Sequence, residues 1–104
     1  MLNQAIVVGR VSNYDELGHI VTIAISRPYK NMNGEYEYDY IPVKLWSGST
    51  NQMEYVKVGD IIGIKGRLER LGVELRVVAE KITFLAQGKG EEITNENQST
   101  KNDN

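Results

Sequence analysis

The sequence contains no cysteine and only one histidine, His19, in 104 residues. Without cysteine the chain has no disulfide framework, no thiolate metal cluster and no cysteine nucleophile, and one histidine excludes a multi-histidine metal site. Long apolar runs are also missing, since the longest fall far short of the roughly 20 residues that cross a bilayer. The N-terminus lacks the basic and apolar regions of a signal peptide. We therefore expect a cytoplasmic protein with no membrane partner.

An excess of positive charge is lacking too, because 12 Lys and Arg residues face 14 Asp and Glu residues. The composition changes after Leu85, and from 86 to 104 the only large apolar residue is Ile93. Such a segment cannot bury enough surface to offset its ordering entropy, so we expect residues 86–104 to form a disordered acidic tail. The tail accounts for the whole net charge of −2. Residues 1–85 are neutral, and their charge does not argue against an anionic partner.

Residues 1–85 show the alternation and the β-branched content of strands rather than the period of helices. A turn is expected at Asn33-Gly34 and another at Leu71-Gly72. The only expected helix is short, at about 51–56, with Ser49 or Thr50 as its cap. Strands are expected at 3–11, 19–27, 36–46, 60–70 and 74–85. This order predicts an all-β protein, a five-stranded Greek-key barrel of the OB-fold type with one short helix between strands 3 and 4, over residues 1–85.

The third expected strand has two different faces, because successive side chains of a strand point to opposite sides. Its apolar positions Ile41, Val43 and Leu45 are expected in the core. The other face carries aromatic residues, and five of the chain's eight aromatics lie between 29 and 46. Exposed aromatic rings accept unpaired bases at about 1–3 kcal/mol per base. The alternative is that these rings only cover a sheet or a subunit interface. The five are Tyr29, Tyr36, Tyr38, Tyr40 and Trp46.

Positive side chains on this and the neighbouring strands are candidates for holding phosphates. Glu37 and Asp39 alternate with the tyrosines, but with no histidine nearby we expect solvated charges at the strand end rather than a metal or acid–base site. No set of residues has the arrangement of an enzyme active site, so we expect no catalytic residue, no metal and no cofactor. The candidate phosphate ligands are Lys30, Lys44, Arg67, Arg70 and Arg76, with Arg10 and Lys65 as weaker ones.

Five motifs in order resemble those of bacterial single-stranded DNA-binding proteins, and together they cover nearly all of 1–85. The resemblance implies non-specific binding of single-stranded DNA in replication, recombination or repair, by a homo-oligomer that is a tetramer rather than a dimer. By motif position it implies stacking on Tyr29, Tyr40 and Trp46, whereas Tyr36 and Tyr38 rest on strand alternation alone. The motifs are Met1–Gln4 with Ile6–Val11, then Val21–Ile25, Asp39–Trp46, Lys57–Asp60 with Gly63–Leu68, and Glu80–Leu85.

The chain also departs from that family pattern. Gln4 stands where a basic residue is frequent, and Leu71 offers no stacking ring in a hairpin that is often longer. The tail lacks an acidic tip ending in Pro-Phe, so the resemblance gives no ground to expect recruitment of repair proteins through it. Two alternatives stay open. One is a primosome-type OB module whose aromatic face docks a protein or another subunit, and the other is an OB-fold that binds RNA or oligosaccharide.

Overall fold

The computed structural model describes residues 1–46 and 50–88. It confirms the predicted order of five strands. The predicted helix is instead a four-residue 3-10 turn, η1, and its candidate cap Ser49 lies outside the described residues. Within the described ranges, no helix has the length and apolar character needed to cross a membrane. The elements are β1 (Ala5–Asp15), β2 (Ile20–Lys30), β3 (Tyr36–Lys44), η1 (Thr50–Met53), β4 (Ile61–Leu71) and β5 (Glu74–Ala86).

The connection between β3 and β4 forms only a short 3-10 turn, and its hydrogen bonds show why an α-helix does not form there. Glu54 N–H donates to the carbonyl of Asn51 at 3.3 Å, and Val56 N–H donates to that of Met53 at 3.1 Å. These are the i→i+3 bonds of tight turns rather than the i→i+4 bonds of an α-helix. Lys57 N–H then donates to the Asp60 carboxylate at 2.9 Å, which ends the turn and directs the chain into β4.

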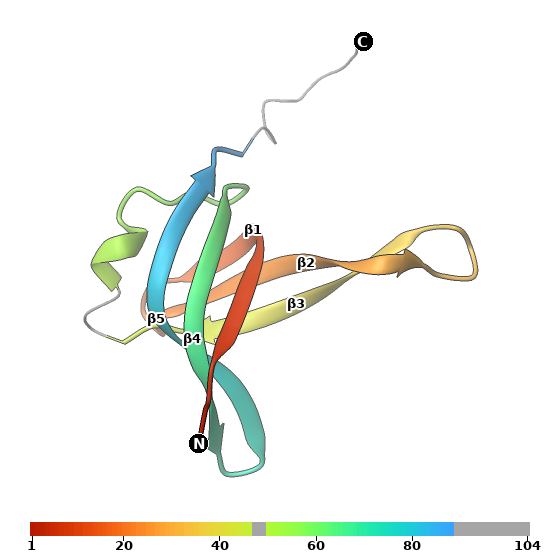
Figure 1. Cartoon of the computed structure of the whole chain (residues 1–104). Coiled ribbons are helices and arrows are strands. Elements are labelled where there is room, and N and C mark those ends of the chain that lie inside the picture. Colours follow the sequence, from red (N-terminus) through yellow and green to blue (C-terminus); the bar gives the residue numbers. More distant parts are fainter. Residues whose placement is uncertain (47–49, 89–104) are drawn as a thin grey trace.

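The strands close into a barrel in the order β1-β2-β3-β5-β4, with β4 returning to pair with β1 (Figure 1). All neighbouring pairs are antiparallel except β3 and β5, which run parallel and meet at Val43–Val77 and Lys44–Val78. This closed five-stranded arrangement is the predicted OB-fold. Closure gives every strand two neighbours, although β3 meets β5 only at its last two residues.

The core confirms the predicted alternation in the third strand. Val43 and Leu45 are fully buried, Ile41 packs against them, and Met53 from η1 covers one part of the same cluster. Gly66 of β4 lies so close to β5 that a Cβ there would overlap the carbonyl group of Val78. The buried cluster consists of Val11, Val21, Ile23, Val43, Leu45, Met53, Ile62, Ile64, Val77, Ala79 and Ile82.

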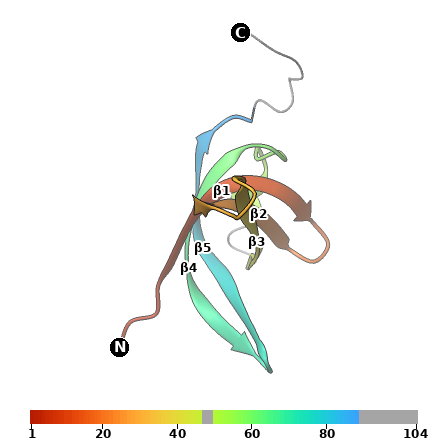
Figure 2. The same cartoon turned by 90° about the vertical axis from the view of Figure 1, so that its right-hand side faces the viewer.

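Two hairpins extend from the barrel in different directions, as both views show (Figures 1 and 2). The β2–β3 hairpin turns at Gly34, with a φ of 79°, and Asn31 accepts two backbone N–H groups there. The β4–β5 hairpin turns at Gly72-Val73, one residue later than predicted, because Leu71 still pairs with Glu74. These hairpins carry the outer parts of the surface described below.

A buried carboxylate joins the start of β4 to the end of the described chain. Asp60 is 4% exposed, and it accepts hydrogen bonds from the backbone N–H groups of Lys57 at 2.9 Å and Gly88 at 2.8 Å. Its own carbonyl accepts from Val11 N–H at 2.8 Å. Strand β5 includes Ala86, the first residue of the expected tail, and the part of that expectation at 89–104 lies outside the described residues.

Candidate nucleic-acid interface

Five exposed aromatic side chains, called here the aromatic strip, lie on β2, on β3 and just beyond the end of β3. We use this name for Tyr29, Tyr36, Tyr38, Tyr40 and Trp46, whose exposed fractions lie between 52% and 62%. The alternation that buries Val43 and Leu45 places Tyr40 and Trp46 on the opposite side of the same strand and its continuation. All five aromatic rings are thus more than half exposed to solvent in the monomer.

Small residues on β2 leave the central rings uncovered. Ala24 lies opposite Tyr40 and Ser26 lies opposite Tyr38 in the antiparallel register. Directly opposed side chains of a strand pair are within contact distance, so a large residue at either position would pack onto the neighbouring ring. At the third position Lys30 faces Tyr36, and its Nζ lies 5.7 Å from the ring centroid, within reach of a cation–π interaction.

A hollow of about 400 Å³ lies beside Trp46. It is lined by Trp46 together with Arg67 of β4 and Val78, Ala79 and Glu80 of β5. A second hollow of about 280 Å³ adjoins Pro42 and Lys44 and is lined on its other side by Glu74 and Arg76 of β5. The barrel therefore brings Arg76 next to the end of β3, and Arg67 next to Trp46, which lies just beyond that end.

Both of these arginines bind the same carboxylate. Arg76 donates to Glu69 Oε1 from Nη2 at 2.8 Å and from Nε at 3.1 Å, and Arg67 Nη2 donates to Glu69 Oε2 at 3.2 Å. Arg67 Nε also lies 4.0 Å from Glu80. Hydrogen bonds from Arg76 first, and then from Arg67, hold the pKa of the Glu69 carboxyl below its usual range. Glu69 is thus ionised at neutral pH and neutralises part of the positive charge beside the strip.

The two remaining predicted cations have backbone partners. Lys44 Nζ donates to the carbonyl of Gly18 at 2.8 Å, which ties the end of β3 to the turn between β1 and β2. Arg70 Nε donates to the carbonyl of Gly72 at 3.0 Å. Strand alternation places Arg70 on the opposite face of the β4–β5 hairpin from Arg67. The structure therefore brings Lys44 to the strip and does not bring Arg70 there.

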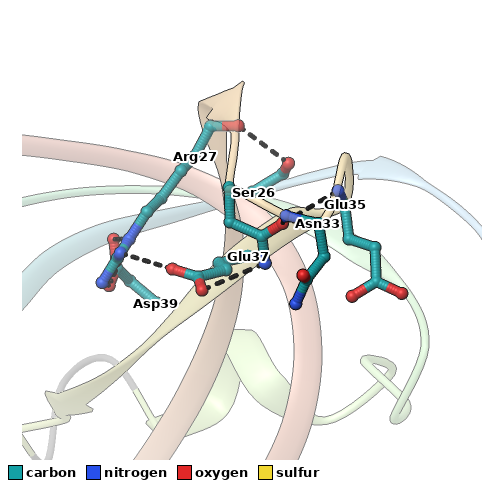
Figure 3. Close-up of polar contacts among 7 residues, drawn as sticks. Ser26, Arg27, Asn33, Glu35, Glu37 and Asp39 are labelled. Atoms are coloured by element: carbon teal, nitrogen blue, oxygen red, sulfur yellow. Dashed lines mark hydrogen bonds and ion pairs between the residues drawn. The ribbon is translucent and has the colours of Figure 1, made fainter.

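The β2–β3 hairpin carries an ion-pair cluster (Figure 3). Strand alternation places its carboxylates on the face of β3 opposite to the tyrosines of that strand. Arg27 of β2 donates from Nη1 to Glu37 at 2.8 Å and from Nη2 to Asp39 at 2.8 Å. Glu37 and Asp39 are about half exposed, as solvated charges would be, and both also bind this guanidinium. The hydrogen bonds that Arg27 donates hold the pKa of Asp39 below its usual range, and the same bonds to the Asp39 carboxylate raise the pKa of Arg27. These contacts link the two strands where the register of β2 shifts between Ser26 and Lys30.

Sequence reasoning missed two residues that shape this surface, Arg27 and Glu69. A signal for Glu69 was available, since counting back from a two-residue turn at Gly72-Val73 places it opposite Arg76. No comparable signal existed for Arg27. Its reach to both carboxylates depends on extra residues in β2 that interrupt the pairing, and strand patterns do not reveal such a bulge.

Exposed aromatic rings on a strand of an OB-fold barrel, with arginines at their flank, are typical of single-strand nucleic-acid-binding surfaces. Comparison with known proteins gives the family. The model of the single-strand binding protein family matches residues 2–85. The chain belongs to the single-strand binding protein family.

Individual relatives agree with this assignment. The chain is 31% identical over 123 residues to single-stranded DNA-binding protein 3 of Listeria innocua, covering 98% of this chain and 77% of that protein. It is 33% identical over 107 residues to single-stranded DNA-binding protein 1 of Clostridium acetobutylicum, covering 85% and 97%. Among solved structures, it resembles the mitochondrial single-stranded DNA-binding protein of S. cerevisiae with a TM-score of 0.65 at 20% identity, covering 83% and 97%. At that identity the likeness supports the fold alone.

Proposed function

We propose that this protein binds single-stranded DNA with little sequence preference, and that bases stack on the aromatic strip. The observation that carries this proposal is the exposure of Tyr36, Tyr38 and Tyr40 on one face of β3, with Trp46 just beyond it and small residues opposite Tyr38 and Tyr40. Every base has a flat face, so stacking tolerates any sequence. Membership of the family, and relatives named single-stranded DNA-binding proteins, support DNA as the ligand. The role that we propose for this binding is in replication, recombination or repair.

Phosphates are held in this proposal by the cations that flank the strip. Lys30 lies at its outer end beside Tyr36, and Lys44, Arg67 and Arg76 lie around the hollows near Trp46. Residues 1–85 have no net charge, and both arginines are already ion-paired. Stacking therefore supplies more of the affinity than phosphate contacts, and affinity falls only gently as salt rises.

The single tryptophan allows a direct test. Titration of the full chain with oligo-dT should quench the fluorescence of Trp46, because a stacked base contacts its ring. Matched oligo-rU, measured in the same buffer, separates a DNA preference from general binding of single strands. No fluorescence change with oligo-dT, together with no shift in a gel, would contradict the proposed function.

We further propose that the protein acts as a homo-oligomer, a tetramer rather than a dimer. Ile6 and Val8 of β1 are 66% and 49% exposed, and Leu85 of β5 is 51% exposed. A Cβ at Gly63 would lie 3.5 Å from Leu85 and 3.6 Å from Val8, so these side chains adjoin the same part of β4. An apolar surface of this kind supports self-association. Light scattering on the full chain should give the mass of four copies, and a monomer would contradict this.

A further inference from the structure

The surface beside Trp46 holds two arginines and the single carboxylate that binds them both. We call this group the Arg67–Glu69–Arg76 cluster. Glu69 and Arg76 are directly opposed across β4 and β5, and Arg67 lies two residues before Glu69 on the same face. All three side chains are between 29% and 41% exposed, so an incoming phosphate can reach each of them.

We propose that Glu69 is an autoinhibitory residue that competes with DNA phosphates for Arg67 and Arg76, and so sets both the affinity and the salt response of single-strand binding. This inference rests on the proposed function. It concerns how strongly the surface attracts phosphates, rather than whether bases stack on the strip.

The geometry of the contacts supports competition. A guanidinium binds carboxylate and phosphate oxygens through the same planar set of N–H donors. Arg76 directs two of its donors, Nε and Nη2, at Glu69, and Arg67 directs one. A phosphate that takes these donors must displace the carboxylate, which then faces a second negative charge at close range. Phosphate binding here therefore replaces one anion by another at the arginines, so the net gain in binding free energy is small.

The position of the cluster makes this exchange relevant to the aromatic strip. Arg67 lines the same hollow as Trp46, and Arg76 lines the hollow beside Pro42 and Lys44. A strand with bases on Tyr40 and Trp46 would carry its phosphates past these hollows. Removing the charge of Glu69 would release the donors of Arg67 and Arg76 that now bind it, and would leave only Glu80, at 4.0 Å, beside Arg67.

The test compares Glu69→Gln with the wild type and with Glu54→Gln, all as full chains. The first variant keeps the size of the side chain and removes its charge. The second makes the same change of net charge at an exposed residue beside η1, where it lines a different hollow with Tyr14 and His19. Each protein is titrated with oligo-dT across a series of salt concentrations, with Trp46 fluorescence as the readout.

Glu69→Gln should bind about 2- to 30-fold more tightly at low salt, the fold-change that corresponds to release of two exposed ion pairs. Its plot of log affinity against log salt should be steeper by about 0.7 for each phosphate newly neutralised. Glu54→Gln should stay close to the wild type in both respects.

Two results would overturn the inference while the wild type still binds. Equal affinity and slope in Glu69→Gln and Glu54→Gln would mean that Glu69 does not compete with DNA. Weaker binding by Glu69→Gln would mean that Glu69 instead positions the arginines for phosphate. Failure of the wild type itself to bind oligo-dT is a different outcome, because it removes the proposed function and this inference with it.

Discussion

Replacement of Tyr40 by alanine separates stacking on the strip from every other source of affinity. Tyr40 is 62% exposed and lies opposite Ala24, so its ring contributes little to the core. Loss of an exposed strand tyrosine changes the free energy of unfolding by less than about 1 kcal/mol. Loss of one stacking partner changes the free energy of binding by about 1–3 kcal/mol, which is about 5- to 150-fold in affinity.

The assay is a titration with oligo-dT at two salt concentrations, with Trp46 as the reporter in every variant. The matched control is Tyr55→Ala, since Tyr55 is 82% exposed and lies beyond η1, outside the strip. Tyr40→Ala should lose the same factor at both salt concentrations, because a phenol ring carries no charge and its removal releases no counterions.

Two results would refute the reasoning. Wild-type affinity in Tyr40→Ala would show that bases do not stack at this position. An equal loss in Tyr55→Ala would show that the titration reports any change in surface aromatics rather than the strip. Urea unfolding of both variants checks that a loss of binding is not a loss of fold.

Two further predictions concern stability. Gly66→Ala should lower the free energy of unfolding by about 3 kcal/mol, because its Cβ would overlap the backbone carbonyl of Val78. The control Gly63→Ala makes only ordinary contacts and should have a urea midpoint close to that of the wild type. Equal urea midpoints for the two variants would contradict this prediction. Arg27 lowers the pKa of Asp39 in the folded protein, so Asp39 takes up a proton more readily in the unfolded chain. The stability that this pair contributes is therefore complete above about pH 5 and is lost as the pH falls below about 4. In Asp39→Asn the urea midpoint should change less with pH between about pH 5 and pH 3 than it does in the wild type. The same pH dependence in both proteins would show that the pair does not stabilise the fold.

The fold could be predicted from the sequence because each strand has a recognisable alternation of residues within its own segment. In β3 the alternation separated Val43 and Leu45, which are buried, from Tyr40 and Trp46, which are exposed. The Asn33-Gly34 turn was likewise visible, since Gly34 adopts the positive φ that such a turn needs. These features depend on residues that are neighbours in sequence, so a pattern in one strand is enough to find them.

The partners of the cations could be predicted only in part, because they depend on which residues of different strands face one another. Lys44 reaches the carbonyl of Gly18, 26 residues away, and no pattern in β3 indicates that contact. The bulge in β2 that lets Arg27 bind Asp39 and Glu37 is equally hidden. Positive residues were therefore easy to identify as candidates, whereas their availability to phosphate required the register of the barrel.

The buried carboxylate of Asp60 determines where the domain can be shortened. Its Oδ1 accepts the Gly88 N–H in a site that is only 4% exposed. A chain cut after Leu85 would keep nearly all of β5 but would lose this hydrogen bond, at a cost of about 0.5–1.5 kcal/mol. We therefore expect a chain that ends at Gly88 to be more stable than one that ends at Leu85. The last strand of the domain is secured by a residue that lies beyond the end of that strand.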